Sequence, residues 1–266
     1  MVREFADKDE WAVVLGGSSG LGLATAKKLA AHGLNLCLVY RVRRSETIAL
    51  ESTFEAIERE HKIQLIHYNV DAINPEKRSQ VLEGLVDKVR QKGKVKVLIH
   101  SIAKGNLKPM ISEDSKELGN DDLRLTIESM AISLYDWTKD IFLRQLFSND
   151  ARIISFTSEG NKKAWKNYAA VSAAKVALEA ITRSIALEFA SHGIKANCIQ
   201  AGITDTASLR MIPGNETLKT QALQRNPSGR MTTPKDVADV VYLLTKAEAK
   251  WITGAIIPAD GGEHLN

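Results

Sequence analysis

The chain has 266 residues, of which 44% are hydrophobic, and a formal net charge of +4. This length suits one α/β domain with a large core, and the charge is too small to indicate nucleic-acid binding. No apolar run approaches the roughly 20 residues that cross a membrane, and residues 1–8 lack a secretory signal pattern, so we expect a cytoplasmic protein without membrane association. The cysteines, Cys37 and Cys198, lack metal-ligand spacing, and no metal site is predicted.

Strand-like apolar runs alternate with helical segments from one end of the chain to the other. Such alternation predicts an α/β fold, a doubly wound parallel sheet of about seven strands with helices on both faces. No internal repeat, low-complexity tract or Pro/Gly-rich linker divides the sequence, so residues 1–266 are predicted to form a single domain. The one expected insertion lies near residues 207–230.

A glycine-rich turn follows the first predicted strand, Trp11 to Leu15, and precedes a helical run. Gly16 permits a tight turn, Gly20 lets the backbone approach a pyrophosphate, and Gly22 allows close helix packing. The following helix offers free N–H groups and a positive dipole to a phosphate. The glycines alone could serve an ordinary turn, but the strand before them and the helix after them favour a single-domain Rossmann fold with a cofactor site. The other residues predicted to bind cofactor in this turn are Ser18, Ser19 and Leu21.

The residues after the second predicted strand, Leu34 to Tyr40, indicate which cofactor is bound. Rossmann folds that prefer NAD usually place an acid at this strand end, roughly 20 residues past the glycines, to bind the ribose 2′-hydroxyl. Here Arg41 and Arg43 follow the strand, and guanidinium groups suit a 2′-phosphate by charge and by forked geometry. A solvated basic loop is the alternative. The sequence therefore predicts NADPH as the cofactor.

Tyr168 and Lys175 stand seven positions apart in a segment that is predicted to be an uninterrupted helix. Seven residues make nearly two turns, which puts both side chains on one face, so a long lysine can reach toward the phenol. A nearby ammonium lowers the pKa of a phenol from its usual value of about 10, which suits proton transfer. A packed tyrosine near a solvated lysine is the alternative that this pair alone does not exclude.

With its Gly-x3-Gly-x-Gly spacing and this tyrosine–lysine pair, the chain resembles the short-chain dehydrogenase/reductase family over nearly its whole length. The resemblance implies further cofactor contacts after the later strands. They are Asn69 and Val70 beside the adenine, then Ser101, Ile102 and Ala103, and finally Gly202, Ile203, Thr204 and Thr206, in a segment similar to the family's Pro-Gly-x3-Thr. Two residues depart from the family pattern, Leu15 in place of a threonine and Ala201 in place of a proline.

In most members of this family the tyrosine stands four residues before the lysine, where this chain has Val171, which cannot deliver a proton. The seven-residue step and the segment His100 to Ala103 resemble instead the enoyl-acyl-carrier-protein reductases. Ser158, seventeen residues before Lys175, occupies the place of the serine that hydrogen-bonds the substrate oxygen; a hydroxyl that caps a turn is the alternative. The set of Ser158, Tyr168 and Lys175 is most similar to the NADPH-dependent subgroup of these reductases.

This resemblance implies reduction of the carbon–carbon double bond of a trans-2-enoyl thioester on acyl carrier protein, with NADPH, in fatty-acid biosynthesis. Tyr168 and Ser158 would hold the thioester oxygen, and Lys175 would hydrogen-bond the nicotinamide ribose. The net charge of +4 would help an acidic carrier protein dock, with Lys104 and Lys108 as candidate contacts, although a solvated surface role is the alternative for both. A homotetramer formed through the helix that carries Tyr168 is a family-level expectation.

Residues 207–230 are expected to cover the substrate, as the equivalent helical segment does in the family. The apolar residues that would face the acyl pocket, if they do not serve ordinary core packing, are Leu209, Met211, Ile212, Leu218 and Leu223. Two other functions stay open: reduction of a ketone, a 3-oxoacyl thioester or an enone in another pathway, and a non-catalytic role as an NADPH-binding sensor or scaffold. Val171 argues against a standard ketone reductase, and the retained Ser158, Tyr168 and Lys175 argue against a sensor.

Overall fold

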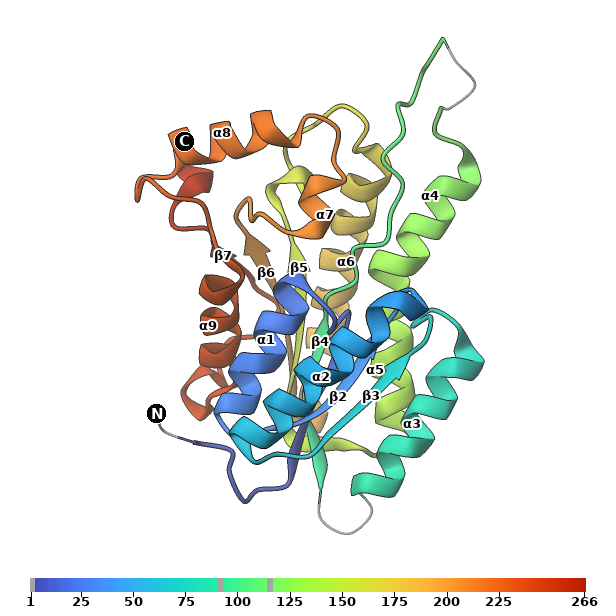
Figure 1. Ribbon diagram of the computed structural model, residues 1–266, viewed down its shortest axis with the longest axis vertical. Helices are drawn as coiled ribbons and strands as arrows, with labels where there is room; N and C mark the ends of the chain where they lie inside the picture. The colour runs from blue at the N-terminus through green and yellow to red at the C-terminus, as the bar shows by residue number, and fades with distance from the viewer. Residues whose placement is uncertain (1–2, 90–92, 114–116) are drawn as a thin grey trace.

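The computed structural model describes residues 3–89, 93–113 and 117–266, which form an α/β fold around one sheet (Figure 1). The sheet has seven strands in the order β3-β2-β1-β4-β5-β6-β7, and every neighbouring pair is parallel. The strands are β1 (Glu10–Leu15), β2 (Asn35–Tyr40), β3 (Leu65–Asn69), β4 (Lys94–His100), β5 (Phe147–Thr157), β6 (Ile194–Ala201) and β7 (Ile256–Ala259). The predicted doubly wound parallel sheet is confirmed.

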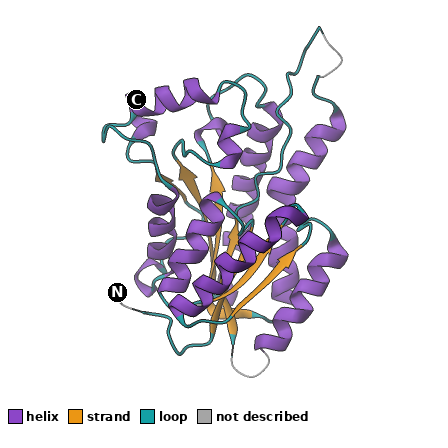
Figure 2. Cartoon of the chain, viewed as in Figure 1, coloured by secondary structure: helices purple, strands orange, loops and turns teal. Residues whose placement is uncertain are grey.

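Helices cover both faces of this sheet (Figure 2), because alternate residues of a strand point to opposite sides. Val13 and Leu15 of β1 share a buried cluster with α3, α5 and α6, whereas Ala12 and Val14 share one with α1, α2 and α9. The helices of these layers are α1 (Gly20–Ala31), α2 (Arg44–His61), α3 (Pro75–Val89), α4 (Asn120–Ile127), α5 (Ser133–Leu143), α6 (Ala169–Glu188) and α9 (Pro234–Thr245), with a π-helical turn, Glu128–Ile132, between α4 and α5. Among the described residues, no helix has the length and apolar character needed to span a bilayer.

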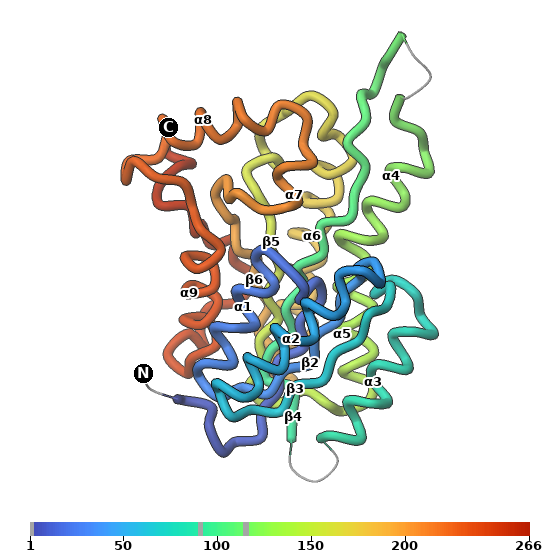
Figure 3. Tube along the Cα trace, viewed as in Figure 1, coloured from blue at the N-terminus to red at the C-terminus, as the bar shows by residue number. Residues whose placement is uncertain are grey.

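The connectivity creates one crevice at the carboxyl ends of the strands. From β1 the chain proceeds outward through β2 to β3, and then returns to place β4 on the other side of β1. Open α/β sheets bind ligands where the strand order reverses in this way. The trace in Figure 3 places the loops after β1, β4 and β5 at the end of the sheet that carries α7 (Ala207–Arg210) and α8 (Asn215–Arg225).

An ion-pair network fixes α8 to the neighbouring loops. Arg225, the last residue of α8, donates from Nη2 to Glu263 at 2.7 Å and from Nη1 to Glu159 at 3.2 Å. Glu263 also accepts from the backbone N–H of Ile203 at 3.1 Å, and Glu159 directly follows Ser158 in the chain. The expected insertion is therefore tied both to the C-terminal residues and to the loop after β5.

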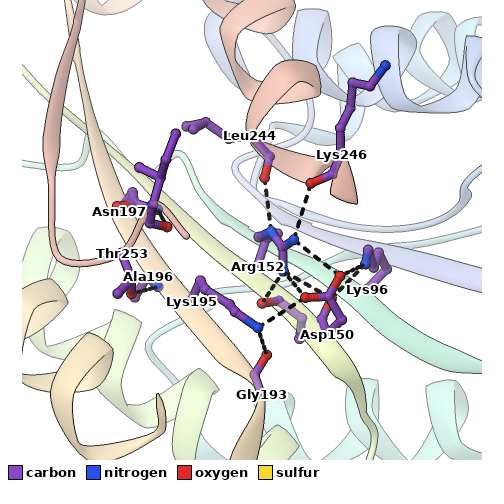
Figure 4. Close-up of polar contacts among 12 residues, drawn as sticks. Lys96, Asp150, Arg152, Gly193, Lys195, Ala196, Asn197, Leu244, Lys246 and Thr253 are labelled. Carbon is purple, nitrogen blue, oxygen red and sulfur yellow. Dashed lines mark hydrogen bonds and ion pairs between the residues drawn. The ribbon is translucent and has the colours of Figure 1, made fainter. Parts of the chain in front are cut away.

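A second network lies at the opposite end of the sheet, near the amino end of β5 (Figure 4). Asp150 accepts from Lys96 at 2.8 Å, from Lys195 at 3.1 Å and from Arg152 at 2.6 Å, so one carboxylate joins three adjacent strands. The fully buried Arg152 side chain also donates to the carbonyl oxygens of Leu244 at 3.0 Å and Lys246 at 3.2 Å. These carbonyls belong to the end of α9, where they lack helical partners and favour a cation.

Candidate active site

One cavity of about 980 Å³ lies over the carboxyl ends of the strands and contains most of the predicted site residues. Those that line it are Gly16, Ser18, Ser19, Gly20, Leu21, Arg41, Arg43, Val70, Ser101, Ile102, Ala103, Ser158, Tyr168, Lys175, Gly202, Ile203, Thr204 and Thr206. Gly22 and Asn69 are not among the lining residues. Among the described residues, no group of three or more His, Cys, Asp or Glu side chains could hold a metal ion.

The glycine turn brings the backbone of β1, β4 and α1 into close contact. A Cβ on Gly16 would stand 2.3 Å from the Ser101 carbonyl oxygen, and Gly16 has a φ of +85°. A Cβ on Gly22 would stand 2.2 Å from the Gly16 carbonyl oxygen, so Gly22 serves helix packing, as predicted. Ser19 precedes α1 and makes no side-chain capping bond to the described residues, which leaves the first N–H groups of α1 available to an anion. The turn therefore fits a dinucleotide pyrophosphate.

The loop after β2 carries the two predicted arginines, and Asn69 holds it in place. Asn69 Oδ1 accepts from the backbone N–H of Val42 at 3.0 Å, and its Nδ2 donates to the Val42 carbonyl at 3.2 Å. The Asn69 side chain therefore fixes the backbone between Arg41 and Arg43, and an adenine contact of Asn69 stays a prediction. Arg41 pairs with Asp71, a residue that the sequence analysis missed.

Tyr168 and Ser158 meet inside the cavity, from the start of α6 and the end of β5. Tyr168 is buried and directly precedes α6, rather than lying inside an uninterrupted helix as predicted. Its ring packs against Trp165, with ring centroids 5.0 Å apart. The buried Ser158 hydroxyl makes no well-aligned hydrogen bond to a described residue, yet it lies close enough to the phenol to act on its pKa. Both residues line the cavity.

Burial dominates the electrostatics of Tyr168 and Lys175. Burial raises the pKa of the Tyr168 phenol, and the Ser158 hydroxyl lowers it only in part. The Lys175 ammonium donates to the Phe156 carbonyl at 2.6 Å, and its predicted effect on the phenol stays a prediction. Burial lowers the pKa of Lys175 to about 8, against the opposing effects of Cys198 and Glu179. At neutral pH the site therefore presents a protonated phenol and a charged lysine.

Glu179 is a second site residue that the sequence analysis missed. It is buried one turn beyond Lys175 on α6 and accepts a hydrogen bond from Thr157 Oγ1 at 2.6 Å and another from Asn161. Thr157 and Asn161 flank Ser158, so Glu179 fixes the loop that presents this serine. The four-residue spacing from Lys175, which puts both side chains on one helical face, was the available signal.

One part of the cavity wall is apolar. Leu107, Met130, Trp165 and Val171 line it together with four of the five predicted residues, Leu209, Met211, Ile212 and Leu218; Leu223 does not line it. The two candidate carrier contacts are engaged within the chain, since Lys104 pairs with Asp71 and Lys108 with Asp122.

Comparison with known proteins bears on this site directly. A family model described as enoyl-(acyl carrier protein) reductase matches residues 16–264, from the first glycine of the turn to the C-terminal residues. The chain belongs to the short-chain dehydrogenase/reductase family. The resemblance inferred from the sequence is thereby confirmed, and the chain is an oxidoreductase of a family that uses a nicotinamide cofactor.

Relatives of this short-chain dehydrogenase/reductase differ in the substrates that their names give. The 1-cyclohexenylcarbonyl-CoA reductase of Streptomyces collinus is 24% identical over 263 residues, which are 98% of this chain and 89% of that protein. A 3-oxoacyl-[acyl-carrier-protein] reductase of Staphylococcus epidermidis is 27% identical over 256 residues, 96% of this chain and 98% of the relative. Family membership alone therefore does not select the substrate.

A solved structure shows the same fold. The enoyl-acyl carrier protein reductase of Bacillus cereus, in complex with NADP+ and an indole naphthyridinone, superposes on this short-chain dehydrogenase/reductase with a TM-score of 0.85. The alignment covers 100% of this chain and 99% of that one at 24% sequence identity. At this identity the likeness is one of fold.

Proposed function

We propose that this protein is an NADPH-dependent enoyl-[acyl-carrier-protein] reductase that reduces the double bond of a trans-2-enoyl thioester. The observation that carries the proposal is the placement of Tyr168 beside Ser158 in the cavity, while Val171 lines the wall at the usual tyrosine position. A phenol displaced by most of a helical turn suits a substrate whose reacting carbon is farther from the oxygen than in a ketone. The acyl chain would lie along the apolar wall, under residues 207–230.

The side chains support reduction of a conjugated thioester. A bound nicotinamide supplies the hydride that the β-carbon accepts. Negative charge then develops on the thioester oxygen, where the Tyr168 and Ser158 hydroxyls would donate hydrogen bonds; a donor fixed at such a position lowers a barrier by about 3 kcal/mol. Because burial raises the pKa of Tyr168, the phenol stays protonated at neutral pH and would donate its proton to the enolate that hydride addition leaves, which gives the saturated thioester.

Two features support NADPH and an acyl carrier protein as partners. The loop after β2 presents Arg41 and Arg43 to the cavity, and no acid stands at the end of that strand. The net charge of +4 would attract an acidic carrier protein. The homotetramer and the cytoplasmic location stay predictions.

The substrate is tested by NADPH oxidation with a short trans-2-enoyl thioester and with the matching 3-oxoacyl thioester, each offered on acyl carrier protein and on coenzyme A. We expect turnover of the enoyl compound and little of the 3-oxo compound. Preference for the 3-oxo compound would replace the proposal with a ketone reductase of unusual tyrosine position. NADPH binding without turnover of either compound would favour a sensor.

Lys175 makes cofactor binding dependent on pH. Its pKa of about 8 is lowered from the usual value, so its positive charge is present below pH 8 and is lost as the pH rises through that value. If Lys175 binds the nicotinamide ribose, the affinity for NADPH should fall by about fivefold between pH 7 and pH 9, measured by fluorescence titration. The Lys175→Arg variant keeps its positive charge over this pH range. Its affinity for NADPH should be lower than that of the wild type and should not change between pH 7 and pH 9. A flat wild-type profile would contradict this role.

A further inference from the structure

Asp71 bridges two cations at the part of the cavity that the loop after β2 lines. Its Oδ2 accepts from Arg41 Nη1 at 2.6 Å and from Lys104 Nζ at 3.2 Å. All three residues line the cavity, and they follow three different strands: Arg41 follows β2, Asp71 follows β3 and Lys104 follows β4. Because β1 lies between β2 and β4, the bridge joins loops on both sides of the glycine turn.

The bridge is held by its own backbone. Asp71 Oδ1 accepts from the N–H of Ile73 at 3.3 Å, which directs Oδ2 toward the two cations. On the other side, the Asn69 side chain fixes Val42, next to Arg41. A carboxylate of fixed position therefore neutralises the cations that the cavity offers to the adenosine half of a dinucleotide.

We propose that Asp71 is a specificity-determining residue that competes with the 2′-phosphate of NADPH for Arg41 and Lys104. This inference rests on the NADPH part of the proposed function. A phosphate and a carboxylate require the same guanidinium and ammonium donors, and two anions in one groove repel each other. NADH carries a hydroxyl in place of the phosphate and does not compete in this way. Asp71 thus reduces the preference for NADPH over NADH.

The exposure of the bridge allows this exchange. The Arg41 side chain is 64% exposed and that of Asp71 is 30% exposed, so water screens their attraction and the arginine can turn to another anion. Arg41 also keeps further N–H donors beyond the Nη1 group that Asp71 occupies. The phosphate would therefore take over donors from Asp71 without unfolding the loop.

The test is Asp71→Asn, which removes the charge and keeps an oxygen for the N–H of Ile73. NADPH and NADH are titrated by fluorescence, and adenosine 2′,5′-bisphosphate and AMP by calorimetry, to isolate the adenosine half. We expect the two 2′-phosphorylated ligands to bind about fivefold more tightly and the other two to change by less than about twofold. In an Arg41→Ala background, most of the gain should disappear.

Asp239→Asn is the matched control. Asp239, on α9, also pairs with two lysines, Lys28 at 2.6 Å and Lys235 at 2.9 Å, but does not line the cavity. Its loss should leave all four affinities within about twofold, which excludes a general effect of net charge. Unchanged or weaker binding of NADPH by Asp71→Asn would overturn the inference but not the proposed function. A selective loss of NADH binding would also overturn the inference, because it would assign Asp71 to the ribose 2′-hydroxyl. A wild-type protein that binds neither dinucleotide would overturn both the inference and the proposed cofactor.

Discussion

Replacing Tyr168 with phenylalanine is expected to lower kcat about 100-fold or more, while the dissociation constant of NADPH changes by less than about twofold. The ring fills the space between Trp165 and Gly160, where a Cβ on the glycine would stand 2.6 Å from Tyr168 Cε1. Phenylalanine keeps that packing and removes only the hydroxyl. The loss should therefore appear in the chemical step, measured with the enoyl thioester at saturating NADPH.

Two further variants separate the phenol from its surroundings. Tyr242→Phe removes a hydroxyl that donates to Glu4 outside the cavity, and it should leave kcat unchanged. Ser158→Ala should lower kcat by about tenfold, because one of two proposed donors remains. If Tyr168→Phe turned over at the rate of Tyr242→Phe, another group would have to supply the proton.

Arg152→Ala is expected to lower the free energy of unfolding by about 3 kcal/mol or more, and Tm by about 10 °C. The change deletes a fully buried side chain and leaves the carbonyls of Leu244 and Lys246 without their partner at the end of α9. It also removes one of the three cations around Asp150. Urea unfolding followed by circular dichroism, with thermal melts, measures the effect.

Lys195→Ala is the control for this second prediction. Lys195 donates to the same Asp150 at 3.1 Å, but its side chain is 20% exposed and it makes no bond to α9 among the described residues. Its removal should lower the free energy of unfolding by about 1 kcal/mol or less. Equal effects of the two changes would show that Asp150 pairing, rather than support of α9, is what Arg152 contributes.

The sequence predicted the parts of the fold that depend on local pattern. Strands that are buried on both faces are continuous apolar runs, and β1 is buried from Trp11 to Leu15. The alternation of such runs with helical segments therefore indicated a parallel sheet. The glycine turn could also be predicted, because its requirements are local. Gly16 adopts a positive φ, and Gly22 has no space for a side chain.

The start of α6 could not be read in the same way. The segment around Tyr168 is rich in alanine, which has a high helix propensity, so the predicted helix included Tyr168. Asn167 has a φ of +62°, a left-handed conformation that interrupts a helix and that asparagine tolerates better than most residues. Tyr168 consequently stands at the helix boundary, and the spacing to Lys175 no longer fixes their relative orientation.

Contacts between distant segments could not be predicted from the sequence. Asn69 holds Val42 across two strand ends, and Asp71 meets Arg41 and Lys104 only after three loops converge. No periodicity or local motif encodes such pairings, since they depend on strand order. The glycine turn and the shared location of Ser158, Tyr168 and Lys175 at one cavity were therefore predictable, whereas the residues that position or neutralise the site were not.

The carbon that receives the hydride distinguishes an enoyl reductase from a ketone reductase. Purified protein is given a trans-2-enoyl thioester or, in a parallel reaction, the matching 3-oxoacyl thioester. Each reaction contains NADPH deuterated at C4 of the nicotinamide, on either face, and the product is identified by mass spectrometry and NMR. We expect a saturated thioester with deuterium on its β-carbon from one of the two cofactor forms of the enoyl reaction. A saturated product without deuterium at that carbon from both forms, or deuterium transfer only to the carbonyl carbon of a 3-oxoacyl thioester, would contradict the proposed function.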